Sequence, residues 1–146
     1  LYALAQDLAV AMDIDSIILA VSRHIEEIFQ WKTAFLLPEG GTLRMHTASL
    51  GLILDADEMA VATWAFGHRA MAGYGTDTLP GSRLRYVPIQ SSRGVLGVMG
   101  VKPAEPAGVI TPEQARILLA FANQTALALE RVNLAGKVAE GSKPEG

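Results

Sequence analysis

The chain has 146 residues, a formal net charge of −3 and 50% hydrophobic residues. One domain of this length can bury a substantial core, and a slightly acidic chain lacks the basic surface that binds nucleic acid. Cysteine is absent, which excludes disulfides, thiolate zinc sites and cysteine nucleophiles. No apolar run approaches the roughly 18 residues that span a bilayer, so we expect no direct membrane insertion.

The two ends of the chain indicate a piece of a longer protein. Residue 1 is Leu, and it opens into an amphipathic pattern without the basic stretch of a secretory signal. Residues 136–146 are polar and glycine-rich, and we expect a tail or a linker there, part of which is not native. We therefore place the folded domain in residues 1–135.

Four helices are predicted, and polar residues indicate where three of them begin. The first covers about residues 1–12, and Asp13 or Asp15 caps the second. The third begins at Asp55, because Glu58 stands at capping-box spacing from it. The fourth begins after its cap at Thr111, with proline in the first helical position.

Two β-hairpins complete the pattern. The first pairs residues 32–37 with 42–50 around a Gly-Gly turn, and the second pairs residues 84–90 with 95–102. The resulting order is α-α-β-β-α-β-β-α, without βαβ repeats. It predicts an α+β domain, in which helices flank a central antiparallel sheet and the first and last helices pack together.

Glycine-rich segments offer little support for phosphate binding. The stretch that begins at Gly73 lacks the third glycine of a dinucleotide fingerprint, and it follows a helix where that motif must follow a strand. Gly94, Gly97 and Gly100 lack the lysine and hydroxyl of a phosphate loop. We expect a strand there, with a helix rather than a ligand packed closely against it.

The residues of catalysis and metal binding are scattered. His24, His46 and His68 fall on three separate elements, and no Gly-x-Ser-x-Gly motif occurs. A small enzyme would need an acid–base pair, and helix capping already explains the dense carboxylates at residues 55–58. We therefore expect no catalytic residue, no metal and no cofactor.

Recognition-type side chains concentrate between residues 64 and 86. Their cations could pair with a carboxylate or phosphate, and their aromatic rings could stack on a ligand over the sheet. The alternative, which we favour from the residues alone, is a loop held by Asp77 and threonine hydroxyls, with Trp64 in the core. The candidate ligand-binding residues are Trp64, His68, Arg69, Tyr74, Thr76, Asp77, Thr78, Arg83 and Arg85.

Both terminal helices carry apolar stripes wider than a small sheet would cover. A helix that stays amphipathic to its end suggests a parallel coiled coil that continues into a neighbouring domain. The alternative is that both helices pack on their own sheet. We favour a homodimer, because alanines permit close helix approach. The candidate dimer interface consists of Leu4, Leu8, Leu118, Phe121, Thr125 and Val132.

The element order resembles the GAF domain, a small-molecule sensing and dimerisation module. Residues 1–135 are similar to the GAF domain of Kdp-type potassium-sensor histidine kinases, and the middle segment carries the more specific likeness. The segments that carry the resemblance are LYALAQDLAVAMDIDSI, WAFGHRAMAGYGTDTLPGSRLRYVPI, and GVLGVMGV before PEQARILLAFANQTALALERV.

The resemblance implies a cytoplasmic input domain in a sensor anchored in the inner membrane, acting through a two-component system that controls potassium uptake. Its partners would be the neighbouring kinase domains, residues 136–146 would link the domain to the kinase core, and the fragment itself would be non-catalytic. Members that reduce methionine sulfoxide or hold bilins depend on cysteine, which this chain lacks. We expect regulation through ligand binding or dimer-helix packing; the alternative is a purely structural dimerisation module without ligand.

Overall fold

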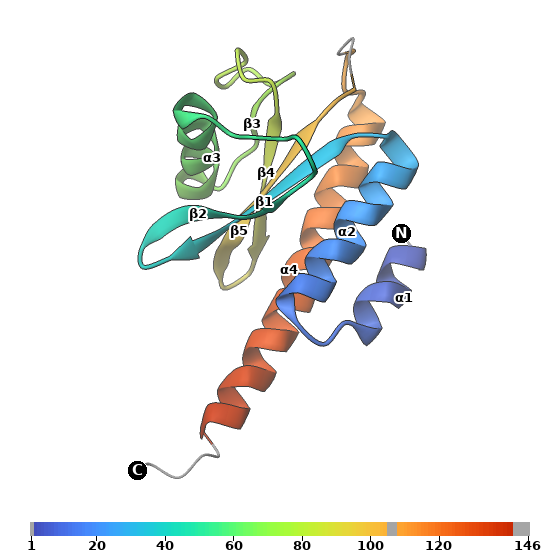
Figure 1. Cartoon of the computed structure of the whole chain (residues 1–146), viewed down its shortest axis with the longest axis vertical. Helices are drawn as coiled ribbons and strands as arrows, with labels where there is room; N and C mark the ends of the chain where they lie inside the picture. Colours follow the sequence, from blue (N-terminus) through green and yellow to red (C-terminus); the bar gives the residue numbers. More distant parts are fainter. Residues whose placement is uncertain (1, 105–107, 142–146) are drawn as a thin grey trace.

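The computed structural model describes residues 2–104 and 108–141, with side chains described through residue 133 (Figure 1). It confirms the predicted order of helices and hairpins and adds a two-residue strand inside the expected loop. The elements are α1 (Tyr2–Val10), α2 (Ile14–Phe29), β1 (Lys32–Glu39), β2 (Thr42–Ala48), α3 (Ala56–His68), β3 (Ala72–Gly73), β4 (Arg85–Ser91), β5 (Gly94–Lys102) and α4 (Pro112–Gly141).

The five strands form one antiparallel sheet in the order β2-β1-β5-β4-β3. The two hairpins meet where β1 pairs with β5, and there Phe35 lies opposite Met99. The short strand β3 extends the far edge by pairing Gly73 with Arg85. The fold is therefore the α+β arrangement that the sequence predicts.

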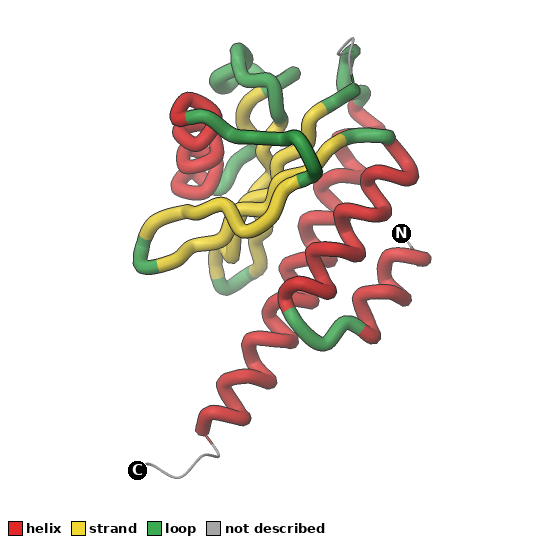
Figure 2. The backbone as a smooth tube through the Cα atoms, in the orientation of Figure 1, coloured by secondary structure: helices red, strands yellow, loops and turns green. Residues whose placement is uncertain are grey.

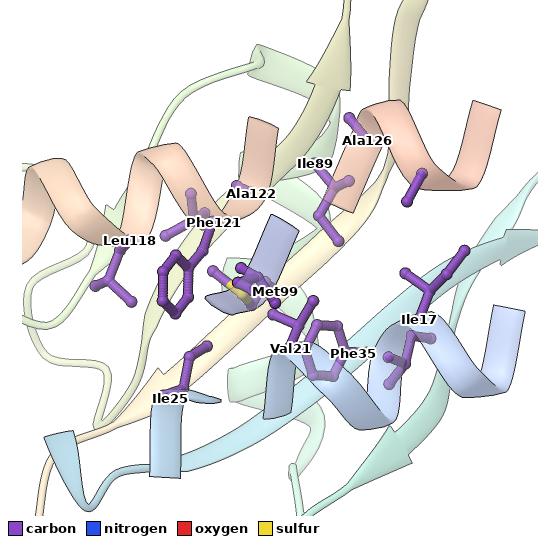
Figure 3. Packing of buried hydrophobic residues seen from close by; sticks show 14 of the residues in the cluster. Ile17, Val21, Ile25, Phe35, Ile89, Met99, Leu118, Phe121, Ala122 and Ala126 are labelled. Atoms are coloured by element: carbon purple, nitrogen blue, oxygen red, sulfur yellow. The ribbon is translucent and has the colours of Figure 1, made fainter. Parts of the chain in front are cut away.

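Helices cover both faces of the sheet. Figure 2 shows α3 on one side and α1, α2 and α4 together on the other. On the three-helix side, Phe35 and Met99 of the sheet meet Val21 of α2 and Phe121 of α4 (Figure 3). Each large apolar side chain buried there contributes about 1.5–3 kcal/mol. The predicted packing between the first and last helices is confirmed, since α1 contacts α4.

Local side chains begin the helices where the sequence predicts. The Asp13 carboxylate accepts a 2.8 Å hydrogen bond from the Ser16 backbone N–H at the start of α2. At α4 the capping is reciprocal: the Thr111 hydroxyl accepts from the Gln114 N–H, and the Gln114 side chain accepts from the Thr111 N–H. These bonds satisfy helix N–H groups that have no partner within the helix.

The expectation that a helix packs on the glycines of β5 is wrong. A Cβ on Gly97 would lie 2.6 Å from the carbonyl oxygen of Leu36 in the adjacent strand, and one on Gly100 would lie 3.0 Å from the Tyr86 ring. Strand residues three apart point to opposite faces, so one helix could not lie against both. The close neighbours are a strand backbone and an aromatic ring.

The last helix, α4, continues to Gly141. It therefore includes residues 136–141 of the segment expected to be a tail or linker, and residues 142–146 lie outside the described residues. Within the described ranges, no helix combines the length and apolar character needed to cross a membrane.

Candidate functional site

A carboxylate is buried beneath the first turn of α3. Glu58 is 5% exposed. Its Oε1 atom accepts hydrogen bonds from the Ser82 hydroxyl at 2.6 Å and the Tyr86 hydroxyl at 2.7 Å. Its Oε2 atom accepts a third, at 3.2 Å, from the backbone N–H of Arg83. These donors replace the water that a buried carboxylate loses, so they tie α3 to β4 and the segment before it.

Only one of the two hydrogen bonds of the predicted capping box forms. Asp55 caps α3, because its carboxylate accepts from the Glu58 N–H at 2.9 Å. The Glu58 side chain turns inward to Ser82 and Tyr86 instead of reaching back toward Asp55. The sequence does offer one signal: Glu58 stands four and seven residues before Ala62 and Ala65, which are buried on the same helix face.

The tyrosine that donates to this carboxylate keeps its proton over the usual pH range. Burial, followed by the hydrogen bond to Glu58 and its negative charge, raises the pKa of the Tyr86 hydroxyl above its usual range. Tyr86 therefore stays protonated and serves as a donor. Both oxygens of Glu58 accept hydrogen bonds, so the carboxylate links α3 to β4 and to the segment before it.

A hollow of about 500 Å³ opens beside Glu58 and carries mixed charge. The exposed Arg83 guanidinium lies 3.8 Å from the Asp55 carboxylate and 3.9 Å from that of Glu58. At these distances the solvated Arg83–Asp55 pair contributes little to stability. The lining residues are Asp55, Asp57, Glu58, Val61, Leu79, Gly81, Ser82 and Arg83.

Three of the candidate ligand residues lie at the C-terminal end of α3. The Trp64 and His68 rings stack with their centroids 4.1 Å apart, and the His68 Nδ1 atom lies 2.9 Å from the Trp64 carbonyl oxygen. Arg69 follows in the left-handed conformation that ends the helix, and its side chain is exposed. These three residues lie along α3 itself.

The following loop holds itself in place. The Thr76 hydroxyl donates to the Gly73 and Thr78 carbonyls at 2.8 Å and accepts from the Thr78 N–H. The Tyr74 hydroxyl donates to the Gly108 carbonyl at 2.6 Å. The buried Arg85 donates from Nε to the Tyr74 carbonyl, and burial lowers the pKa of its guanidinium. Threonine hydroxyls therefore hold this loop as the alternative interpretation expects.

Asp77 was expected to help hold the loop or to orient a ligand, and it lies exposed at the tip. The space beneath α3, where we expected a ligand, is filled by a cluster of buried side chains. Tyr86 occupies the region above Gly100. The cluster consists of Ala34, Leu36, Leu43, Ala62, Ala65, Ala72, Leu84, Tyr86 and Val98.

Five of the six candidate dimer residues are buried within one chain, so that assignment needs correction. Their exposed fractions are 5% or less, and only Val132 is half-buried. The stripe that looked wider than the sheet could cover also packs against α2, which lies beside α4 on the sheet, while α1 contacts both of these helices. The five residues are Leu4, Leu8, Leu118, Phe121 and Thr125.

One arginine joins the terminal helices. The Arg131 Nη2 atom on α4 donates to the Leu8 carbonyl at 2.7 Å and to the Ala11 carbonyl at 3.0 Å. These carbonyls lie at the C-terminal end of α1, where a cation is favoured by the helix dipole. No local pattern in the sequence predicts this contact, because Arg131 and its partners on α1 lie more than 100 residues apart.

The histidines are held on three separate elements. His24 bonds Asp7 and His46 bonds Asp15, each at 2.7 Å between Nε2 and a carboxylate oxygen. Over the residues whose placement is described, no three His, Asp or Glu side chains gather as a metal-binding group.

Two curated proteins are similar to this chain in sequence. The chain is 34% identical over 135 residues to the sensor protein KdpD of Escherichia coli (strain K12), which covers 92% of this chain and 15% of that protein. It is 35% identical over 94 residues to the sensor protein KdpD of Clostridium acetobutylicum, covering 64% of this chain and 10% of that protein. The chain therefore spans about one-seventh or less of the length of these relatives.

The solved structure of the native GAF domain of the potassium sensor histidine kinase KdpD from E. coli superimposes with a TM-score of 0.80. The two are 32% identical, and the match covers 97% of this chain and 96% of that one. Residues 13–131 match the family profile described as GAF domain. With its sheet, its flanking helices and this match over most of its length, the chain belongs to the GAF domain family.

Proposed function

We propose that this chain is a non-catalytic input domain of a sensor histidine kinase that controls potassium uptake. The observation that carries the proposal is the near-complete match to the GAF domain of a potassium sensor kinase. The buried Glu58 supports the non-catalytic part, because its three hydrogen bonds tie α3 to β4 and the segment before it, as a structural role requires. The domain would act in the cytoplasm, beside the kinase domains of a membrane-anchored protein.

The regulatory step would be a change in how α1 and α4 pack. Arg131 of α4 donates hydrogen bonds to the end of α1, so a displacement of α4 would also move α1 or break these bonds. A stimulus shifts such an equilibrium only if it binds the two packings with different affinity. Neighbouring domains would receive the change through the terminal helices of a homodimer.

A ligand, if one is sensed, would contact the exposed charges around α3 and its loop. Arg69, Asp77 and Arg83 are accessible, and Arg83 borders the hollow beside Glu58. The filled space beneath α3 favours a second candidate function, a dimerisation relay without ligand.

A chimera tests the regulatory role. The chain replaces the corresponding segment of E. coli KdpD, and autophosphorylation is measured at low and high potassium beside the parent protein and a version without the segment. We expect the chimera to respond to potassium as the parent protein does, and the version without the segment to respond differently. A deletion that leaves the response unchanged would contradict the proposal.

Thermal unfolding separates the ligand-sensing role from the structural one. The chain is heated with cyclic nucleotides, ATP, or potassium against sodium at matched ionic strength, because selective binding to the native state raises the melting temperature. A saturable rise that Arg69→Ala and Asp77→Ala abolish supports sensing at this site. A rise that both variants retain places the ligand elsewhere, and a flat response supports the relay.

A further inference from the structure

A cavity of about 370 Å³ lies between α2 and the end of the β1–β2 hairpin. Its volume falls within the roughly 300–1,000 Å³ that is typical of small-molecule sites. It borders α2, which covers the sheet face opposite α3 (Figure 2), so it is separate from the hollow beside Glu58. The residues that line it include Asp15, Ile18, Leu19, Ser22, Thr33 and Ser49.

Three hydroxyl groups form a chain along one wall of this cavity. Thr33 is 1% exposed, and its hydroxyl oxygen lies 2.8 Å from that of Ser22 and 3.4 Å from that of Ser49. The Thr33 backbone N–H also donates to the Ser49 hydroxyl, at 2.8 Å. Three hydroxyl hydrogens serve two links, so one O–H at an end of the chain is left for a partner outside it. Both ends of the chain, Ser22 and Ser49, line the cavity.

A carboxylate stands at the mouth of the cavity. The Asp15 Oδ1 atom lies 2.7 Å from the His46 Nε2 atom, and this contact joins α2 to β2. Among the residues that the structure describes, none donates a hydrogen bond to the second oxygen, Asp15 Oδ2. The Asp15 side chain is 85% exposed, so a ligand that enters from solvent can reach this oxygen. The cavity therefore combines a fixed acceptor at its mouth with hydroxyls along its wall.

This lining favours a neutral ligand that carries several hydroxyl groups. No lysine or arginine is among the lining residues in the described part of the chain, so an anion would face Asp15 without a countercharge. An ammonium group pairs with a carboxylate, but it cannot accept the O–H that the chain leaves over. A ligand hydroxyl can donate to Asp15, and a second one can accept from the chain. Leu19, which is 58% exposed, offers an apolar surface to the C–H groups of such a ligand.

We propose that this cavity binds a small molecule with the chemistry of a polyol or monosaccharide, held by Asp15 and the end of the hydroxyl chain. The inference goes beyond the proposed function, because it places a ligand beside α2 rather than around α3. The helix α2 contacts both α1 and α4. A ligand that favours one position of α2 therefore also shifts the packing of the terminal helices.

Nuclear magnetic resonance titration of the isotopically labelled chain tests the site with myo-inositol, sorbitol and glucose as probes. We expect at least one probe to shift the amide signals of Ser22, Thr33 and Ser49 and to saturate, while the signals of α3 stay unchanged. Saturation and locality distinguish binding from the exclusion of polyols from protein surfaces, which stabilises folded proteins without a site. Ethanolamine is the cationic control. If no probe shifts these signals, or if ethanolamine alone does so, the inference is overturned.

Two substitutions identify the ligand's partners. Ser22→Ala removes one hydroxyl of the chain, and Asp15→Asn replaces the carboxylate by an amide of the same shape. Each should raise the Kd of the bound probe about tenfold, because each weakens a hydrogen bond to the ligand. Asp15 is exposed, so its variant keeps the test valid if Ser22→Ala unfolds the chain.

The matched control is Ser16→Ala, at an exposed position of α2 that does not line the cavity. It should change the Kd less than about twofold. A Kd that is the same in the wild type and in both cavity variants would overturn the site. The potassium response of the chimera tests the regulatory role separately, so failure of the one does not imply failure of the other.

Discussion

Glu58 is held by donors from a distant segment, and this arrangement sets its role. Ser82, Arg83 and Tyr86 all point hydrogen-bond donors at one carboxylate. Hydrogen bonds to a charged group are stronger than neutral ones, and a buried partner left unpaired costs the full loss of its solvation. The group therefore fixes the position of α3 over the sheet.

Replacing Tyr86 by Phe should destabilise the domain clearly. The change removes one donor from the buried Glu58 carboxylate while leaving the ring in place, and we expect a loss of about 1.5–3 kcal/mol. Tyr74→Phe is the matched control, because its hydroxyl donates to a neutral carbonyl in an exposed setting. We expect that variant to lose about 0.5–1.5 kcal/mol. Urea denaturation measures both, and an equal loss would contradict the special role of Glu58.

The sequence predicts the role of a residue when its hydrogen-bond partner lies a few positions away. Asp13 and Thr111 cap helices by bonding backbone groups three residues away, and that spacing is visible in the chain. The direction of the Glu58 side chain is decided by partners 24 to 28 residues later. A capping box was the reasonable local prediction, and only the fold could supply the stronger competing donors.

At the scale of elements, α1 depends on its neighbours. It is nine residues long and has neither an acidic residue in its first turn nor a basic one in its last. Isolated helices of that length are marginal in water. Packing of Leu4 and Leu8 and the bonds from Arg131 therefore stabilise it.

Arg131→Met should loosen α1 while leaving the sheet intact. The substitution keeps the apolar stem but removes the donors to the Leu8 and Ala11 carbonyls. We expect hydrogen exchange of the α1 amides to accelerate roughly tenfold, which corresponds to about 1.4 kcal/mol. Arg116→Met, at an exposed position of α4, should leave the exchange rates of the α1 amides unchanged. Uniform acceleration throughout the chain would instead indicate global destabilisation.

Two glycines should respond to alanine with opposite signs. A Cβ at Gly97 meets the Leu36 carbonyl oxygen at 2.6 Å, so Gly97→Ala should cost about 1–3 kcal/mol through overpacking. Gly67 lies in α3 with nothing within 4 Å of the same position. Gly67→Ala should therefore stabilise the domain by about 0.5–1 kcal/mol through helix propensity. Midpoints of urea unfolding decide the signs, and a loss at Gly67 would contradict the open space there.

At the scale of the whole molecule, the sheet separates two cores of different character. The side covered by α1, α2 and α4 holds large apolar residues such as Phe35 and Phe121. The α3 side packs alanines, leucines and a valine around Tyr86 and includes the buried Glu58. Polar bonding thus contributes to cohesion on the α3 side, so its stability should depend on pH.

Alkaline pH should weaken the fold through Tyr86. Its pKa in the folded state is raised above the ordinary value of 10. Above that pH the unfolded state has lost the proton that the folded state keeps, so stability falls as pH rises. The contribution is complete below about pH 10 and declines by about 1.4 kcal/mol per unit above it. Urea denaturation of the wild type and Tyr86→Phe from pH 9 to 11 measures the difference. Parallel curves would refute the assignment.

The sequence by itself determined the order of elements, the helix starts and the α+β class, because periodicity, caps and turns act over a few residues. Only the tertiary structure decided which apolar helix faces pack against the sheet and which pack against other helices. It placed Leu118 and Phe121 in the core of the single chain, directed the Glu58 side chain inward and brought Arg131 to the end of α1. Those outcomes depend on contacts between distant segments, whose distances follow only once the sheet has assembled and its helices have packed.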